Sequence, residues 1–99
     1  MGNPDFAIPT LKAIIQSNHE LIGVVSNPPK QMGRGRTLSY TSVGKFSRDN
    51  DLTLLQPQSL KSIELKSKLI DLKPDVFVVV AYKILPEDII NIPQFGSLN

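Results

Sequence analysis

The sequence predicts an α/β protein with a doubly wound, mostly parallel sheet, and two observations carry that prediction. Short β-branched apolar runs alternate along the chain with segments whose apolar residues recur at helical spacing. Strands that alternate with helices are joined by right-handed crossovers, which make the strands parallel. In addition, residues 75–82 (DVFVVVAY) are too apolar for a strand with one solvated side, so we expect them in the middle of a sheet covered on both faces.

Four segments have features of a helix. Residues 8–15 place apolar side chains on one helical stripe. Residues 59–74 place three leucines on one face, with Ser59 as the expected N-cap. Residues 85–93 have a proline near each end and predict a short helix, and residues 42–51 favour another.

Besides residues 75–82, three segments predict strands. Residues 21–26 form a β-branched run that a proline pair ends, residues 52–57 favour a short strand, and residues 95–99 begin another. Residues 27–41 contain several turn-forming elements and no apolar period, so we expect a long loop there. Long loops in compact domains are usually functional or disordered.

The two ends of the chain do not fit a complete fold of this class. Residues 1–4 (MGNP) form a turn sequence with no strand before it, and the chain stops just as a strand starts. We therefore expect a fragment in which the first strand and the carboxyl-terminal part of the fold are missing.

Composition narrows the class of protein. The 99 residues suffice for one small domain. The chain has no cysteine and one histidine, His19, which excludes disulfides and leaves too few ligands for a zinc site. The longest apolar run, residues 76–81, is far shorter than a bilayer span, and the first residues lack a signal pattern. We expect a cytoplasmic protein with no membrane partner and no metal.

Positive charge is concentrated in one region although the net charge is only +2. No acid occurs between Glu20 and Asp49, whereas that interval holds five basic residues: Lys30, Arg34, Arg36, Lys45 and Arg48. A local positive field attracts anionic ligands.

Two glycines alternate with two arginines at residues 33–36 (GRGR). Neither a phosphate loop nor a dinucleotide fingerprint fits their spacing, so we do not expect bound ATP or NAD. Two interpretations remain open. The segment is either a solvated mobile loop, which is the commoner case, or a pliant loop whose arginines bind phosphate groups of a nucleic acid.

Ligands of open parallel sheets gather beyond the carboxyl ends of the strands. In this chain that rule selects residues 2–6, the segment from Ser26 onward, residues 81–85 and the position after Asn99. The alternative is that these segments are only connecting turns.

Five separated blocks carry a resemblance to a known family: MGNPDFAIPTL, VVSNPPKQMGRGRTLS, LLQPQSLK, PDVFVVVAYKILP and FGSLN. In this order and at these intervals they resemble the amino-terminal domain of the methionyl-tRNA formyltransferase family. The resemblance implies that residues 1–99 are a partial amino-terminal formyltransferase domain with a Rossmann-like fold. It implies transfer of a formyl group from 10-formyltetrahydrofolate to the amino group of methionyl initiator tRNA, without a metal. We expect the full-length protein to be a monomer.

The resemblance also implies the catalytic residue. Asn99 matches the Asn of the family's Asn-x-His motif, and it would donate a hydrogen bond to the oxyanion that develops during acyl transfer. The His and a later Asp would follow residue 99. We therefore expect the fragment itself to be inactive.

Two binding segments follow from the same resemblance. The pterin of the folate would lie against Tyr82, Lys83, Ile84 and Leu85, although this sequence lacks the glycine that family members often have after the Tyr. The acceptor end of the tRNA would contact Lys30, Gly33, Arg34, Gly35 and Arg36. Phe6 would border the pocket for the methionyl end, with core packing as the alternative role. Two alternative functions remain: another folate-dependent formyltransferase, or a non-catalytic basic module that binds nucleic acid.

Overall fold

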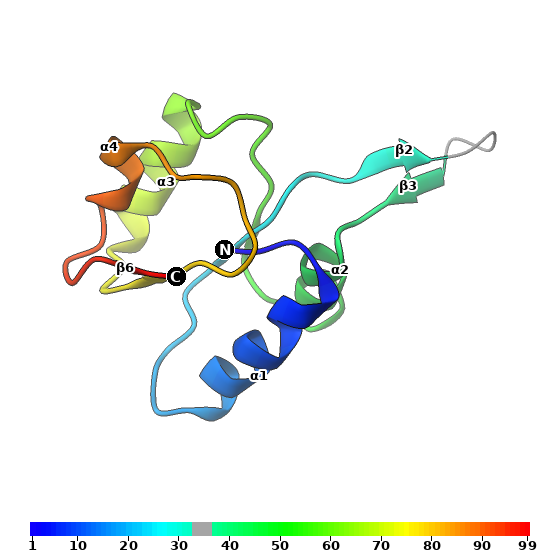
Figure 1. The fold of residues 1–99 in the computed structure, drawn as a ribbon, viewed down its shortest axis with the longest axis horizontal. Coiled ribbons are helices and arrows are strands. Elements are labelled where there is room, and N and C mark those ends of the chain that lie inside the picture. Colours follow the sequence, from blue (N-terminus) through cyan, green and yellow to red (C-terminus); the bar gives the residue numbers. More distant parts are fainter. Residues whose placement is uncertain (33–36) are drawn as a thin grey trace.

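The computed structural model describes residues 1–32 and 37–99. Its helices are η1 (Asp5–Ala7), α1 (Ile8–Gln16), α2 (Ser42–Asp49), α3 (Ile63–Leu72) and α4 (Glu87–Ile90). Its strands are β1 (Val24–Val25), β2 (Lys30–Met32), β3 (Thr37–Ser39), β4 (Leu54–Leu55), β5 (Phe77–Val78) and β6 (Ser97–Leu98). Figure 1 shows how these elements are arranged. Within the described ranges, no helix is long and apolar enough to cross a membrane.

The first two residues join the strand pairs into one parallel ladder. β1 pairs in parallel with β4, and β5 pairs in parallel with β6. Between these pairs, the Gly2 N–H donates to the Val25 carbonyl at 3.1 Å, and the Val80 N–H donates to the Met1 carbonyl at 2.9 Å. The Met1 ammonium donates to the Val78 carbonyl at 2.7 Å. The order is therefore β4, β1, Met1–Gly2, β5, β6, which confirms the predicted parallel α/β sheet.

Helices cover both faces of this ladder because successive strand residues point to opposite sides. One core cluster contains Val24, Leu54 and Val80 together with side chains of α1 and α2. The other contains Val25, Leu55 and Val79 together with side chains of α3 and α4. Figure 1 shows α3 and α4 above the central strands and α1 and α2 below them. The sheet is thus doubly wound, as the apolar run at residues 75–82 predicted.

The start of α3 differs from the prediction. The helix begins at Ile63, and its N-cap is Ser62, whose hydroxyl accepts from the Leu65 N–H at 3.2 Å. Ser59 is not the N-cap, because its hydroxyl and its carbonyl accept from Lys61 and Ser62 N–H groups in the turn before the helix. α3 ends at Leu72, and the C-cap Lys73 adopts a left-handed conformation with φ of 51°.

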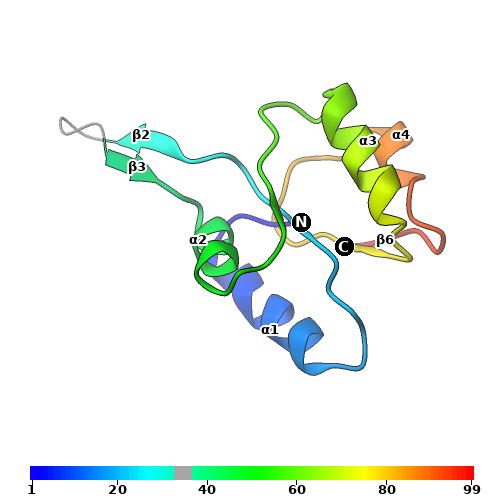
Figure 2. The ribbon, with the colours of Figure 1, turned by 180° about the vertical axis from the view of Figure 1, so that it is seen from behind.

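The predicted long loop at residues 27–41 is wrong for part of its length. β2 and β3 form an antiparallel hairpin that pairs Lys30 with Ser39 and Gln31 with Leu38. Main-chain hydrogen bonds hold these strands, so they need no apolar alternation that a sequence pattern would reveal. Figures 1 and 2 show the hairpin projecting from the body on the side away from α3 and α4.

Candidate functional site

The connections of the sheet mark one edge as the place for a ligand. From Met1–Gly2 the chain passes through α1 to β1 on one side, whereas β5 continues through α4 to β6 on the other side. The loops that leave Gly2 and Val80 therefore diverge, and a crevice at such a switch point is where open α/β sheets bind ligands. The two backbones are close there, since a Cβ at Gly2 would lie 2.7 Å from the Val80 carbonyl oxygen.

Parallel pairing brings most of the predicted site segments to this carboxyl edge. Asn3 follows Gly2, Ser26 follows β1, Ala81 follows the strand that contains β5, and Asn99 follows β6. The arms of the β2–β3 hairpin start from the same edge, directly after Ser26. Three features from distant parts of the chain thus share one edge: the predicted folate segment (residues 82–85), Asn99, and the place where the β2–β3 hairpin joins the body.

The predicted folate segment has an anchored part and a free part. Leu85 is buried in the core under α3 and α4, and Tyr82 packs against the same cluster. Ile84 is 95% exposed, which is unusual for a large apolar side chain, and Lys83 is also exposed. Tyr82 and Leu85 therefore fix the segment, while Lys83 and Ile84 are available for contact with a ligand.

Two unusual local features lie in the same segment. Ala81 has a φ of 49°, a left-handed conformation that costs a non-glycine residue roughly 1–2 kcal/mol. The Tyr82 hydroxyl is buried and has no hydrogen-bond partner among the described residues. Burial also raises the pKa of Tyr82 above its ordinary value. Local strain and unsatisfied polar groups are typical of binding sites.

Phe6 and Asn99 are both accessible. Phe6, in η1, is 67% exposed and belongs to neither of the two core clusters. Asn99 is exposed at the end of β6. Its side chain is therefore free to meet a reactant at the carboxyl edge.

The basic region continues from the hairpin onto α2. Gly33, Arg34, Gly35 and Arg36 lie outside the described residues, and Lys30 of β2 is exposed. On α2, the Arg48 guanidinium lies 4.3 Å from the centre of the Tyr40 ring, next to β3. Lys45 is exposed on the same helix. Asp49 offsets these charges locally, at 4.0 Å from Lys45 and 3.6 Å from Arg48.

Sequence analysis did not identify a polar cluster at the root of the hairpin. The Asn3 Oδ1 accepts from the Ser26 hydroxyl and from the Asn27 N–H, each at 2.9 Å. The Ser26 hydroxyl is also hydrogen-bonded to the Thr41 hydroxyl. Asn3 and Ser26 both lie in segments that the sequence places at the carboxyl ends of strands. A single sequence does not show that their side chains meet.

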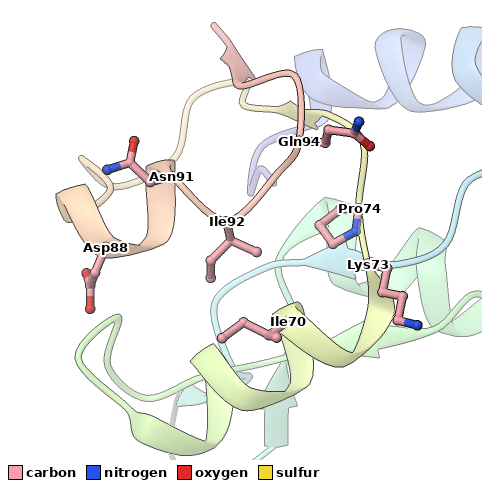
Figure 3. A pocket seen from close by; sticks show the side chains of 7 residues that line it. All are labelled: Ile70, Lys73, Pro74, Asp88, Asn91, Ile92 and Gln94. Atoms are coloured by element: carbon pink, nitrogen blue, oxygen red, sulfur yellow. The ribbon is translucent and has the colours of Figure 1, made fainter.

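Two cavities lie away from the predicted folate segment and Asn99. A cleft of about 460 Å³ opens between the end of α3 and α4, where Figure 3 shows the Ile92 side chain pointing toward Ile70. A groove of about 580 Å³ lies beside Met1, where the chain enters β1 and β5. Gly2 lines the groove, but neither cavity is lined by Phe6, by Asn99 or by residues 82–85, so the candidate site is an open edge and not an enclosed pocket.

Comparison with known proteins agrees with this arrangement. The family model described as "Formyl transferase" matches residues 1–99. The chain is 44% identical to the methionyl-tRNA formyltransferase of Sulfurihydrogenibium sp. (strain YO3AOP1) over 99% of its own length and 32% of that protein. It is 42% identical to the methionyl-tRNA formyltransferase of Clostridioides difficile (strain 630), over 100% of the chain and 32% of that protein. For the protein of the same name from Bacteroides fragilis (strain YCH46), the identity is 38% over 100% of the chain and 31% of that protein.

The chain thus spans about a third of the length of these curated relatives. The match nevertheless extends over every element of the fold, from Met1–Gly2 in the centre of the sheet to β6. The chain belongs to the formyl transferase family.

Proposed function

We propose that this chain is the folate-facing and tRNA-facing part of an enzyme that transfers a formyl group from 10-formyltetrahydrofolate to the amino group of methionyl initiator tRNA. The observation that carries the proposal is the common edge. The exposed Lys83–Ile84 pair, Asn99 and the root of the basic hairpin all follow carboxyl ends of parallel strands. A one-carbon donor and an RNA-borne amine have to meet at one place, and this arrangement offers one.

The proposed chemistry is acyl transfer. The methionyl amine attacks the formyl carbon and a tetrahedral intermediate forms. Its breakdown cleaves the bond between the formyl carbon and the folate nitrogen, so that the amine nitrogen loses one proton, the folate nitrogen gains one, and tetrahydrofolate leaves. The Asn99 amide would donate a hydrogen bond to the oxyanion of the intermediate. Loss of one such donor typically costs about 3 kcal/mol of transition-state stabilisation. The family motif places its other catalytic groups after residue 99, so we expect the 99-residue chain alone to show no turnover.

The folate would bind against the segment from Tyr82 to Leu85. A flat heterocycle suits an apolar wall with a few polar contacts, and Ile84 provides exposed apolar surface there. The Tyr82 hydroxyl has no partner among the described residues, so a ligand atom that reaches it would remove the cost of an unsatisfied buried group.

The tRNA would bind along the basic hairpin and α2. Lys30, Lys45 and Arg48 extend the charge of the GRGR segment toward the body of the protein. Contacts of this kind release counterions from the nucleic acid, so binding should weaken steeply as salt concentration rises.

The proposal is tested with Arg34→Ala in a chimera that joins this chain to the remaining two thirds of the Sulfurihydrogenibium relative. Arginine forks that bind phosphate contribute strongly, so we expect kcat/KM for the tRNA to fall on the order of tenfold or more. The KM for the folate should stay unchanged. Steady-state formylation assays with each substrate varied in turn provide the measurement.

Lys61→Ala serves as the matched control, because Lys61 is an exposed basic residue just before α3 and away from the hairpin. It should leave both parameters unchanged. An equal loss of tRNA and folate parameters in Arg34→Ala would refute the role of the hairpin. A chimera that binds any RNA equally and transfers no formyl group would instead support a non-catalytic binding module.

A further inference from the structure

Asn3 occupies a place where the hairpin meets the centre of the sheet. It directly follows Gly2, between β1 and β5, at the carboxyl edge. The arm that leads out to β2 starts at Ser26, and the arm that returns from β3 ends at Thr41, the N-cap of α2. We call the contacts among Asn3, Ser26, Asn27, Thr41 and Val43 the hairpin root.

Asn3 holds both arms. Its side-chain Oδ1 accepts from the Ser26 hydroxyl and from the Asn27 N–H at 2.9 Å each, which fixes the outgoing arm. Its backbone carbonyl accepts from the Val43 N–H at 3.1 Å, which fixes the start of α2 after the returning arm. The side-chain bonds have one requirement, an oxygen that accepts two hydrogen bonds at once.

A second contact ties the two arms to each other. The hydroxyls of Ser26 and Thr41 are hydrogen-bonded, and the Thr41 hydroxyl also accepts from the Gly44 N–H at 2.9 Å, where it caps α2. Ser26 is 0% exposed, so its hydroxyl is shielded from water. Hydrogen bonds in such a water-poor environment hold a geometry more firmly than exposed ones.

Besides the contact between Tyr40 and Arg48 of α2, little else among the described residues orients the hairpin strands. Lys30, Gln31, Leu38 and Ser39 are all exposed, so their side chains do not pack into either core. An element that is not packed along its length takes its direction from the point where it is attached. For β2 and β3, that point is the hairpin root.

We propose that Asn3 is a positioning residue that sets the direction in which the β2–β3 hairpin leaves the sheet, and through it the placement of a bound RNA beside the folate segment. The part that concerns RNA rests on the proposed function. The part that concerns the hairpin rests on the hydrogen bonds of Asn3 alone. Asp supplies the same double acceptor and should substitute for Asn3, whereas Ala removes it.

The direction of the hairpin is measured by spin-label distances. The chain has no cysteine, so the pair Leu38→Cys and Ile63→Cys places one label on β3 and one on α3. Both side chains are exposed, 52% for Leu38 and 87% for Ile63. A second pair, Ile15→Cys with Ile63→Cys, reports only on the body of the protein.

In Asn3→Ala, we expect a clearly broader distance distribution for the hairpin pair and an unchanged one for the body pair. Asn3→Asp should match the parent protein in both. Asn50→Ala is the matched control, because Asn50 is another asparagine with a side-chain bond, to the Phe46 carbonyl at 2.8 Å, at the far end of α2. It should also match the parent.

Asn3→Ser provides the second variant if Asn3→Ala does not fold, as judged by circular dichroism. The shorter Ser side chain remains polar but does not reach Ser26 and Asn27. It should broaden the distance distribution of the hairpin pair in the same way. An unchanged hairpin distribution in the folded variant would overturn the proposal. Equal broadening of both pairs would also overturn it, because that result indicates general loosening.

RNA binding separates this inference from the proposed function. The probe is a fluorescent RNA stem-loop with a single-stranded 3′ end, measured by anisotropy at several salt concentrations. In Asn3→Ala, the fraction of molecules whose hairpin points in the binding-competent direction falls. If that fraction falls to about a fifth, the affinity for RNA falls about fivefold. The dependence of the RNA affinity on salt concentration should be the same as in the parent protein, because no phosphate contact is lost. A parent protein that binds no RNA would sink the proposed role of the hairpin, while the label distances would still decide the role of Asn3.

Discussion

Three buried polar atoms lack a partner among the described residues, and each belongs to a segment at the carboxyl edge. They are the Asn27 Oδ1 after β1, the Gln56 Nε2 after β4 and the Tyr82 hydroxyl after the strand that contains β5. Buried polar groups in folded proteins are nearly always hydrogen-bonded, because an unmade bond costs about 1–3 kcal/mol. Their shared position supports a ligand site at this edge independently of the resemblance.

At the residue scale, Tyr82→Phe should stabilise the protein without ligand. The substitution removes a buried hydroxyl that has no partner among the described residues, and it keeps the ring in the core under α3 and α4. We expect the free energy of unfolding to rise by about 1 kcal/mol. Urea denaturation followed by circular dichroism provides the measurement.

Tyr40→Phe is the matched control for Tyr82→Phe. The Tyr40 ring lies under the Arg48 guanidinium and its hydroxyl is not among the unsatisfied buried atoms. Stability should change by less than about 0.5 kcal/mol in this variant. A loss of stability in Tyr82→Phe would show that the hydroxyl has a partner in solution.

Sequence reasoning reached some site residues and missed others for a physical reason. The strand-end rule selected residues 81–85 because the end of an apolar run can be recognised locally, whereas the roles predicted for Tyr82 and Asn99 came from the family resemblance. Asn3 was not assigned a role, because its function depends on Ser26 and Asn27, which are 23 and 24 positions away. Contacts between distant residues leave no periodic signal in a single sequence.

At the element scale, the N-cap of α3 is open to a direct test. Ser62→Ala removes the hydroxyl that accepts from the Leu65 N–H, so we expect a loss of about 1 kcal/mol in the free energy of unfolding. Ser59→Ala should cost less, because Ser59 bonds only within the exposed turn before the helix. Chemical denaturation of both variants compares the two serines. A larger loss in the free energy of unfolding for Ser59→Ala than for Ser62→Ala would indicate that Ser59 is the N-cap of the helix.

Prediction succeeded for elements that bury a face and failed for the element that does not. The apolar stripe at residues 8–15 and the leucines of residues 59–74 identified α1 and α3, although α3 starts later than expected. The sheet followed from the alternation of these helices with apolar runs. Lys30, Gln31, Leu38 and Ser39 of β2 and β3 are exposed and these strands are held by main-chain pairing, so their sequence, KQM and TLS, carries no pattern.

At the scale of the whole molecule, the centre of the sheet contains the Met1 amine, whose charged form is disfavoured by burial. The Met1 ammonium bonds to the Val78 carbonyl between two strands, and burial lowers the pKa of this amine from 8.0 to about 6. Between these values the unfolded chain binds more protons than the folded one, so stability should rise with pH from 6 to 8. The expected gain is roughly 2 kcal/mol.

Acetylation of the Met1 amine isolates this effect. The acetylated chain, made by synthesis, has no titrating group at that position, and the groove beside Met1 gives the acetyl group room. Its free energy of unfolding should therefore vary less between pH 6 and 8 than that of the parent. If the free energy of unfolding, measured by urea denaturation, varied with pH identically in the two forms, that result would contradict burial of the Met1 amine.

Gly2 lies so close to the Val80 carbonyl that a Cβ at position 2 would meet its oxygen at 2.7 Å. A methyl group at position 2 would therefore force the two main chains apart at the switch point. The spacing of these main chains is set by backbone atoms, whereas the side chains of Phe6 and Ile84 are 67% and 95% exposed. Substituting Phe6 or Ile84 should therefore leave that spacing unchanged.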